Sequence, residues 1–158
     1  MIIKAVLSIT FVITCVAIAI IDIQKQKIYN ETVAVLLVPA IVSFFAYPEI
    51  SPASRFLGAL SVSGVMLFMC LMIPGAFGGG DIKLMVPVGM FLGLERTLAA
   101  GLFAVLVGGL CSVAVLVKRY GKRRKTGNGS MEFPFGPALC IGSIVALFMS
   151  DKVLSIIV

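Results

Sequence analysis

Long apolar runs alternate with short polar segments along almost the whole chain. We expect each run to form a membrane-spanning helix, and hydropathy places six of them. They cover about Ile2–Ile21, Thr32–Tyr47, Phe56–Ile73, Ile82–Leu94, Thr97–Val117 and Pro134–Met149. The tail that follows, Lys152–Val158, is too short to span a bilayer.

The fourth run is the shortest. About 13 apolar residues rise only ~20 Å in a helix, which is less than the thickness of the hydrocarbon core. Ile82–Leu94 therefore forms either an oblique helix that its neighbours shield, or a helix that begins earlier, within the glycines before it. Non-helical backbone at membrane depth is tolerated only where protein or water covers it.

The composition agrees with a chain made mostly of membrane spans. Its 158 residues are 60% hydrophobic and 13% charged, whereas soluble domains have about 25% charged residues. Six spans of ~20 residues use about 120 residues, which leaves no room for a soluble domain. We therefore expect an all-α, polytopic membrane protein with six transmembrane helices, built as a single integral-membrane domain over residues 1–158.

Basic residues are concentrated between the fifth and sixth runs. Six of the 13 Lys and Arg residues lie within residues 118–125. Such a cluster can bind nucleic acid, but apolar spans flank it on both sides. It therefore fits a cytoplasmic loop that follows the positive-inside rule and contacts anionic lipids. The loop Ile23–Tyr29 adds Lys25 and Lys27, whereas each segment on the opposite side has one basic residue. We expect both chain ends outside, these two loops in the cytoplasm, and no nucleic-acid partner.

The first apolar run also has features of a secretory signal peptide. Lys4 precedes it, and Ala17-Ile18-Ala19 resembles a cleavage site. Lys25 and Lys27 follow the run, however, and basic residues there hold the downstream side in the cytoplasm. We expect the run to be retained as the first helix.

The sequence predicts neither a metal nor a cofactor. The chain contains no histidine, and its four cysteines lie inside apolar runs without forming a CxxC pair. Structural zinc sites require histidine or closely spaced cysteines. We expect these cysteines to be small buried apolar residues.

Two carboxylates lie at the edges of apolar runs. Asp22 closes the first run, and Asp81 comes between three glycines and the fourth run. The loop charges alone place both aspartates at the cytoplasmic face. Each has a plain structural explanation: Asp22 could face water or pair with Lys25, and Asp81 could cap a helix N-terminus.

Taken together, the two aspartates supply the pair of carboxyl groups that an aspartyl protease needs. Like charges held close together titrate as a pair that shares one proton. The ionised carboxylate takes a proton from water, and the protonated one hydrogen-bonds the scissile carbonyl. The glycines before Asp81 would let a substrate backbone approach closely.

Three motifs resemble those of the type IV prepilin peptidases, which are intramembrane aspartyl proteases. Gly78–Leu84, GGGDIKL, looks like the GxGD signature of that family. Asp22–Asn30, DIQKQKIYN, resembles its first motif, although Tyr29 stands where the family commonly has proline. Phe133–Pro137, FPFGP, matches its late PFGP motif. The motifs come in the family's order and span nearly the whole chain.

The resemblance implies a catalytic pair, Asp22 and Asp81, in the cytoplasmic membrane of a prokaryote. The implied substrate is a prepilin with a short basic leader and an apolar helix, cut after glycine at the cytoplasmic face. Lys83 would tune the pKa of Asp81 or contact the substrate backbone, or else extend to the lipid headgroups. The residues implied to bind substrate or shape the site are Gly78, Gly79, Gly80, Lys83, Pro134, Phe135, Gly136 and Pro137.

Large members of the family carry a cytoplasmic insert with paired cysteines and add N-methyltransferase activity. Here the sequence passes directly from Asp22 to the second apolar run. It therefore resembles the short members that serve Flp/Tad-type pili, and we expect no methylation.

Three other functions fit parts of the sequence. A small transporter or channel could use both aspartates as proton or cation ligands, but its site is expected near the middle of the membrane. A non-catalytic subunit of a pilus or secretion assembly would not need both aspartates. Proteases of the presenilin or signal-peptide-peptidase type have a Tyr-Asp motif within a span, whereas this chain has Ile21-Asp22.

Overall fold

The described part of the chain folds into a bundle of six α-helices. The computed structural model describes residues 2–73, 77–121 and 135–157, and these contain no strand. The helices are α1 (Ile2–Lys25), α2 (Asn30–Ala46), α3 (Pro52–Met72), α4 (Gly79–Leu92), α5 (Leu94–Gly121) and α6 (Gly136–Ile157). The expected all-α fold is thus confirmed for the described residues.

Within the residues that the structure describes, three helical segments are long and apolar enough to cross a membrane. These are Ile2–Lys25, Pro52–Met72 and Leu94–Cys111. Two shorter apolar helical segments, Asn30–Ala46 and Gly136–Phe148, accompany them. Large apolar side chains such as Phe45, Leu71 and Leu110 are exposed on the outside of the bundle, where a water-soluble monomer rarely gathers them.

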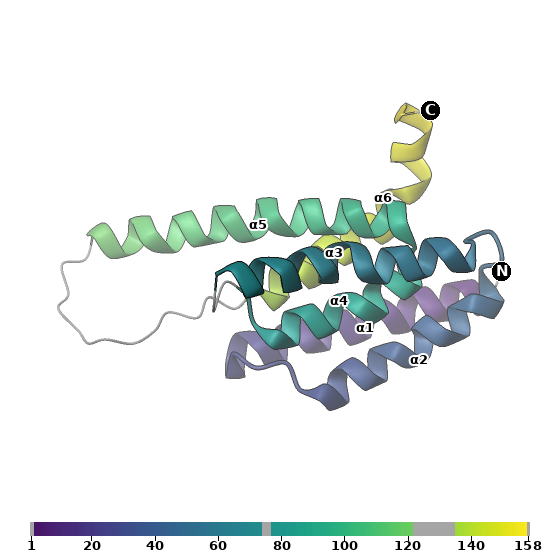
Figure 1. The fold of residues 1–158 in the computed structure, drawn as a ribbon, viewed down its shortest axis with the longest axis horizontal. Helices are drawn as coiled ribbons and strands as arrows, with labels where there is room; N and C mark the ends of the chain where they lie inside the picture. The colour runs from purple at the N-terminus through teal and green to yellow at the C-terminus, as the bar shows by residue number, and fades with distance from the viewer. Residues whose placement is uncertain (1, 74–76, 122–134, 158) are drawn as a thin grey trace.

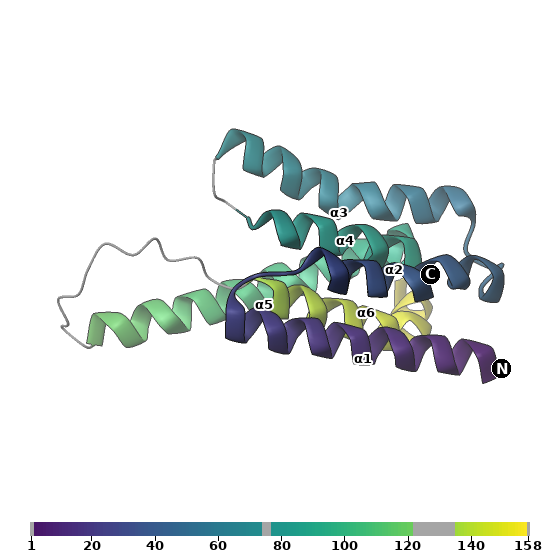
Figure 2. The same cartoon turned by 90° about the horizontal axis from the view of Figure 1, so that it is seen from below.

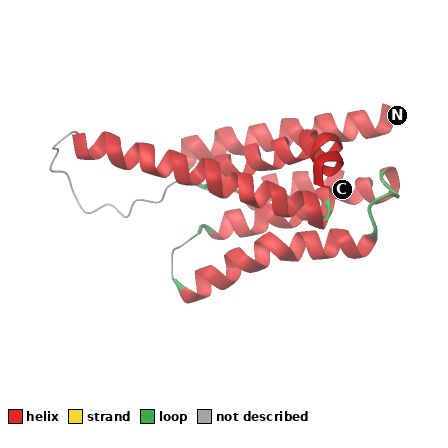
Figure 3. Ribbon diagram, turned by 90° about the horizontal axis from the view of Figure 1, so that it is seen from above, coloured by secondary structure: helices red, strands yellow, loops and turns green. Residues whose placement is uncertain are grey.

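Successive helices run in opposite directions (Figure 1). As a result, the end of α1 and the starts of α2, α4 and α6 lie at one end of the bundle, on the left in Figure 1. Figure 2 shows the same arrangement from a second direction, with α5 extending beyond the other helices at this end. Figure 3 draws the connecting segments in green, and at the opposite end these are residues 47–51 and Gly93.

Most helices begin or end within a few residues of the expected bounds, and three differences matter, at the ends of α1 and α6 and at the start of α4. α1 continues past Ile21 to Lys25, so Asp22 lies inside the helix. The helix ends where Gln26 adopts a left-handed conformation with φ of 51°. α6 continues to Ile157, so the expected end at Met149 and the separate tail are wrong. No glycine or proline interrupts residues 143–157, so nothing there stops the helix.

α4 begins at Gly79, earlier than the expected Ile82. The alternative in which this helix extends back through the glycines is therefore correct. Gly78 is the N-cap residue, and Asp81 is the third residue of the helix. The explanation of Asp81 as an N-cap is wrong for this reason. At the other end, Gly93 alone connects α4 to α5, with a φ of 78° that favours glycine.

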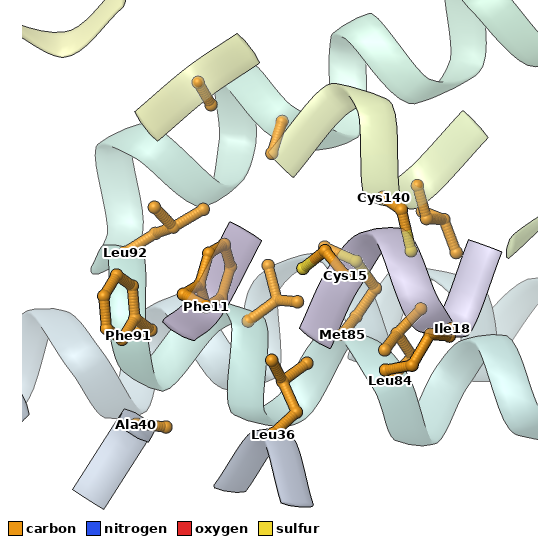
Figure 4. Close-up of a cluster of buried hydrophobic side chains, with 14 of the residues drawn as sticks. Phe11, Cys15, Ile18, Leu36, Ala40, Leu84, Met85, Phe91, Leu92 and Cys140 are labelled. Carbon is orange, nitrogen blue, oxygen red and sulfur yellow. The ribbon is translucent and has the colours of Figure 1, made fainter. Parts of the chain in front are cut away.

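The buried core lies where α1, α2, α4 and α6 meet (Figure 4). Phe11 of α1 stacks on Phe91 of α4 with ring centroids 4.4 Å apart and planes inclined by 12°. Closer to the end of the bundle that holds the aspartates, Cys15 and Ile18 of α1 lie near Leu84 and Met85 of α4. This packing fixes α1 against α4, and these two helices carry Asp22 and Asp81.

Glycines allow two helix pairs to pack backbone against backbone. A Cβ atom added to Gly58 of α3 would lie 2.8 Å from the carbonyl oxygen of Gly89 in α4. A Cβ atom added to Gly142 of α6 would collide with the carbonyl oxygen of Ala100 in α5. Close approach through small residues is typical of helix packing in membranes.

A buried arginine ties three helices together at the end opposite the aspartates. Arg55 of α3 is 1% exposed. Its guanidinium donates to the carbonyl oxygens of Ser43 (2.9 Å), Tyr47 (2.9 Å) and Met90 (2.9 Å). These carbonyls lie in or beside the last turns of α2 and α4, where backbone N–H donors become scarce. The Ser43 carbonyl also accepts the backbone N–H of Tyr47. Arg55 therefore satisfies the C-terminal ends of both helices at once.

Candidate active site

Asp22 is buried in the last two turns of α1. It shares the inward face of the helix with Cys15 and Ile18, and only 5% of its surface is exposed. Among the described residues it forms no ion pair. Lys25 lies instead over the ring of Tyr29, with its Nζ atom 5.4 Å from the ring centroid. The interpretation of Asp22 as a water-exposed or Lys25-paired carboxylate is therefore wrong.

The Asp22 carboxylate faces the first residue of α6. The backbone N–H of Gly136 is directed toward it, and a Cβ atom on Gly136 would lie 2.5 Å from Oδ2 of Asp22. Oδ2 is buried and has no hydrogen-bond partner among the described residues. Leaving a buried polar atom unpaired costs about 1–3 kcal/mol. A carboxylate oxygen in this position can accept a hydrogen bond from a water or a ligand.

Asp81 is held in the first turn of α4. Its backbone N–H donates to the carbonyl oxygen of Gly78 at 3.0 Å. Its side chain reaches back to the backbone N–H of the same glycine, as an acidic residue does at the third position of a capping box. Asp81 is 7% exposed. The local fold of the glycine motif thus turns this carboxylate inward.

The three glycines before Asp81 have different surroundings. A Cβ atom on Gly78 would lie 3.2 Å from Oδ2 of Asp81, so Gly78 leaves room for the carboxylate. A Cβ atom on Gly80 would lie 2.8 Å from Cβ of Ile28. A Cβ atom on Gly79 would meet nothing within 4 Å. In this structure the first and third glycines make the close approaches.

The two aspartates lie in one neighbourhood. The side chain of Ile28, on the turn after α1, contacts the backbone at Gly80 and reaches toward Gly136. Gly80 adjoins Asp81, and Gly136 adjoins the Asp22 carboxylate. The carboxyl groups are close enough for the charge of Asp22 to act on Asp81. The structure therefore brings the two predicted catalytic residues together.

Lys83 points to solvent and binds a neighbouring helix. Its Nζ atom donates to Oδ1 of Asn30 at 3.1 Å. Asn30 is the first residue of α2, so this bond joins the first and second motifs. Contacts of Lys83 with Asp81 or a substrate stay predictions.

The PFGP motif is only partly within the described residues. Phe133 and Pro134 lie outside them. Gly136 and Pro137 form the first turn of α6, a position that suits proline. The ring of Phe135 packs edge-to-face on Phe77, with centroids 5.3 Å apart. This contact joins the PFGP motif to the residue before the glycine motif.

Two residues of this neighbourhood did not stand out in the sequence. Phe77 packs on Phe135 and accepts a hydrogen bond from Sγ of Cys70 through its carbonyl oxygen, at 3.2 Å. Ile28 lies between Gly80 and Gly136. Both are apolar residues in an apolar chain. The only signals are that Ile28 lies inside the first motif and that Phe77 immediately precedes the glycine motif.

Comparisons with known proteins identify the family. Residues 9–113, which include both aspartates, match the model of the type IV leader peptidase family. The chain belongs to this family. The predicted resemblance to the prepilin peptidases is thereby confirmed.

Two curated relatives carry the same name. The chain is 33% identical over 153 residues to the prepilin leader peptidase/N-methyltransferase of Bacillus subtilis (strain 168). This aligned region covers 94% of the chain and 57% of the relative. It is 30% identical over 91 residues to the prepilin leader peptidase/N-methyltransferase of Legionella pneumophila, covering 58% of the chain and 30% of the relative. The chain thus spans little more than half the length of the first relative. No solved structure matches it.

Proposed function

We propose that this chain is an intramembrane aspartyl endopeptidase that removes the basic leader from type IV prepilins of the Flp type. The observation that carries the proposal is the pair Asp22 and Asp81. In a chain of the type IV leader peptidase family, both are buried at one end of the bundle and lie around one side chain, Ile28. Buried carboxylates that neighbour each other are the groups an aspartyl protease needs.

The pair would hydrolyse a peptide bond by sharing one proton. The ionised carboxylate takes a proton from water as the water oxygen bonds to the scissile carbonyl carbon. The protonated carboxyl donates a hydrogen bond to the carbonyl oxygen, which gains negative charge. When the C–N bond breaks, a proton passes to the leaving nitrogen and the pair regains its starting state. In this mechanism Oδ2 of Asp22, which has no donor among the described residues, accepts a hydrogen bond from the water.

The membrane arrangement forms part of the proposal. Six spans over residues 1–158, with both ends outside, would put Asp22 and Asp81 at the cytoplasmic face of the inner membrane. A prepilin is itself a membrane helix, so it would enter laterally between spans with its basic leader in the cytoplasm. No cofactor takes part in this chemistry.

The position of the aspartates favours a protease over a transporter. Asp22 lies near the end of α1 and Asp81 near the start of α4, whereas transporter sites are expected near the middle of the membrane. A non-catalytic assembly subunit would leave a co-expressed prepilin uncut, which separates that alternative directly.

Asparagine at either aspartate should abolish cleavage. In Asp22→Asn or Asp81→Asn, the remaining carboxyl cannot supply both proton roles, so we expect losses of at least about 10³-fold. The measurement is co-expression with a Flp-type prepilin, followed by the shift in electrophoretic mobility on loss of the leader.

The matched control is Glu49→Gln. Glu49 is an acidic residue that pairs with Lys4 at the opposite end of the bundle, and we expect this variant to cut normally. Near-normal cleavage by either aspartate variant, with the protein inserted in the membrane, would exclude the proposed pair.

A further inference from the structure

The turn between α1 and α2 brings one isoleucine back toward Asp22. Gln26, with φ of 51°, reverses the chain, and its backbone N–H donates to the carbonyl oxygen of Asp22 at 2.8 Å. Ile28 follows two residues later and packs, partly buried, against the core. Its side chain therefore points into the bundle beside the aspartates, although it belongs to a connecting segment.

Ile28 bridges the two helix starts that border the carboxylates. A Cβ atom on Gly80 would lie 2.8 Å from Cβ of Ile28 and 3.4 Å from its Cγ1. A Cβ atom on Gly136 would lie 3.2 Å from the other end of the side chain, Cδ1. Because both neighbours are glycines, the isoleucine meets backbone on each side. One side chain thus reaches from α4, which carries Asp81, to the start of α6, where Gly136 adjoins the Asp22 carboxylate.

We propose that Ile28 is a positioning residue that sets the separation between Asp22 and Asp81. This inference rests on the proposed function, since the separation matters only if the two carboxyls share a proton. Ile28 touches neither the proton nor the peptide bond, and it acts through the backbone of α4 and α6. The interaction of two charges changes inversely with their distance, so a small change in spacing changes how the pair titrates.

Isoleucine suits this role because its side chain is stiff. Branching at Cβ restricts χ1, so the position of Cδ1 follows closely from the backbone. Valine at position 28 keeps the branched Cβ that faces Gly80 and loses the Cδ1 that faces Gly136. Alanine loses both branches. The two substitutions therefore shorten the spacer in two steps.

We expect Ile28→Ala to lower kcat about 10- to 100-fold with little change in KM, because a misplacement of about 1 Å costs this much in catalysis. The separation between the two limbs of the kcat–pH profile should also change, because those limbs report the coupled titration of the pair. Ile28→Val should retain most of the rate and show a smaller change in the limbs.

Other titratable groups around the pair stay in place in these variants. The thiols of Cys15 and Cys140 lie on α1 and α6 within the core beside it. Lys83 of α4 is bound to Asn30, and Lys25 of α1 lies over Tyr29. A change in the limbs of the kcat–pH profile of an Ile28 variant would therefore report a change in the distance between the two carboxyl groups.

The matched control is Ile144→Ala. Ile144 is also partly buried against the core, but it lies on α6 about 12 Å along the helix from Gly136. We expect Ile144→Ala to lose about as much stability as Ile28→Ala and to keep the limbs of the wild-type kcat–pH profile. The kinetics are measured with the full-length protein in detergent and a Flp-type prepilin.

Two results would overturn the inference, and they are distinguishable. If the wild type cuts and Ile28→Ala has the same kcat and pH limbs as Ile144→Ala, the spacer role is wrong and the proposed function stands. If the wild type itself does not cut, both fail. Should Ile28→Ala not insert, Ile28→Val decides: a profile identical to the wild type excludes the spacer.

Discussion

Glycines border both aspartates and leave unequal room for an added side chain. A methyl group on Gly79 would meet nothing within 4 Å, and one on Gly78 would lie 3.2 Å from Asp81. One on Gly136 would lie 2.5 Å from Oδ2 of Asp22, far inside the normal contact distance of about 3.5 Å. Gly136 is therefore the glycine at which a minimal change displaces a predicted catalytic group most directly.

We expect Gly136→Ala to lower kcat for prepilin cleavage at least about 100-fold, because the Asp22 carboxylate must move to admit the methyl group. Gly64→Ala is the control, since a Cβ atom there would meet nothing within 4 Å. Initial rates in detergent, with membrane insertion verified for both variants, make the comparison. Equal rates for the two variants would show that the Asp22 position is not critical.

At the scale of helices, the short α4 is held at both ends. Its first turn carries Asp81 and faces Ile28. Near its other end, the carbonyl oxygen of Met90 accepts a hydrogen bond from Arg55. The same guanidinium binds carbonyls at the end of α2, so α2, α3 and α4 are joined through one side chain. Arg55 thus contributes to the position of Asp81 from the far side of the bundle.

Arg55→Met should destabilise the fold by about 2–4 kcal/mol, because the partly buried carbonyl oxygens of Tyr47 and Met90 lose the hydrogen bonds that Arg55 donates. Arg55→Lys should not restore the loss, since an ammonium lacks the planar fork that reaches several acceptors at once. Thermal unfolding in detergent measures both. Ser61→Ala, which removes a bond within a single helix to Gly58, serves as the control with a small effect. An unfolding temperature of Arg55→Met equal to that of the wild type would show that the hydrogen bonds of Arg55 do not stabilise the fold.

The motifs and the helices could be predicted from the sequence, whereas their mutual contacts could not. Asp22 and Asp81 stood out because carboxylates are rare in apolar sequence, and hydropathy located all six helices. The start of α4 was placed too late because glycine has low helix propensity, and here the surrounding bundle outweighs that preference. Ile28 was missed because its role depends on two segments that approach it only in the folded chain.

For the molecule as a whole, the proposed topology can be tested by cysteine labelling. In a background without the native cysteines, Lys27→Cys should react only from the cytoplasm and Glu49→Cys only from outside. The reason is the concentration of Lys and Arg in two loops. Labelling of position 27 from outside would put the aspartates on the wrong side for a prepilin leader.

The N-terminal amine of the mature pilin shows whether the chain also methylates its product. We expect mature pilin made by this chain alone to have an unmethylated N-terminal amine. Only residues 26–29 separate α1, which carries Asp22, from α2, and the basic segment from 118 to 133 has no glycine fingerprint of a nucleotide-binding fold. Mass spectrometry of pilin matured with added S-adenosylmethionine gives the answer, and an added methyl group would contradict this prediction.

The buried Oδ2 atom of Asp22 bears on the stability of the protein as well as on the proposed reaction. Among the described residues nothing donates to this buried oxygen, and a buried oxygen that gains a donor removes a cost of about 1–3 kcal/mol. On the proposed function, the bound peptide and its attacking water supply the missing partner. Substrate then acts as a ligand that stabilises the folded protein. A high concentration of prepilin in the membrane would therefore slow the unfolding and degradation of this chain.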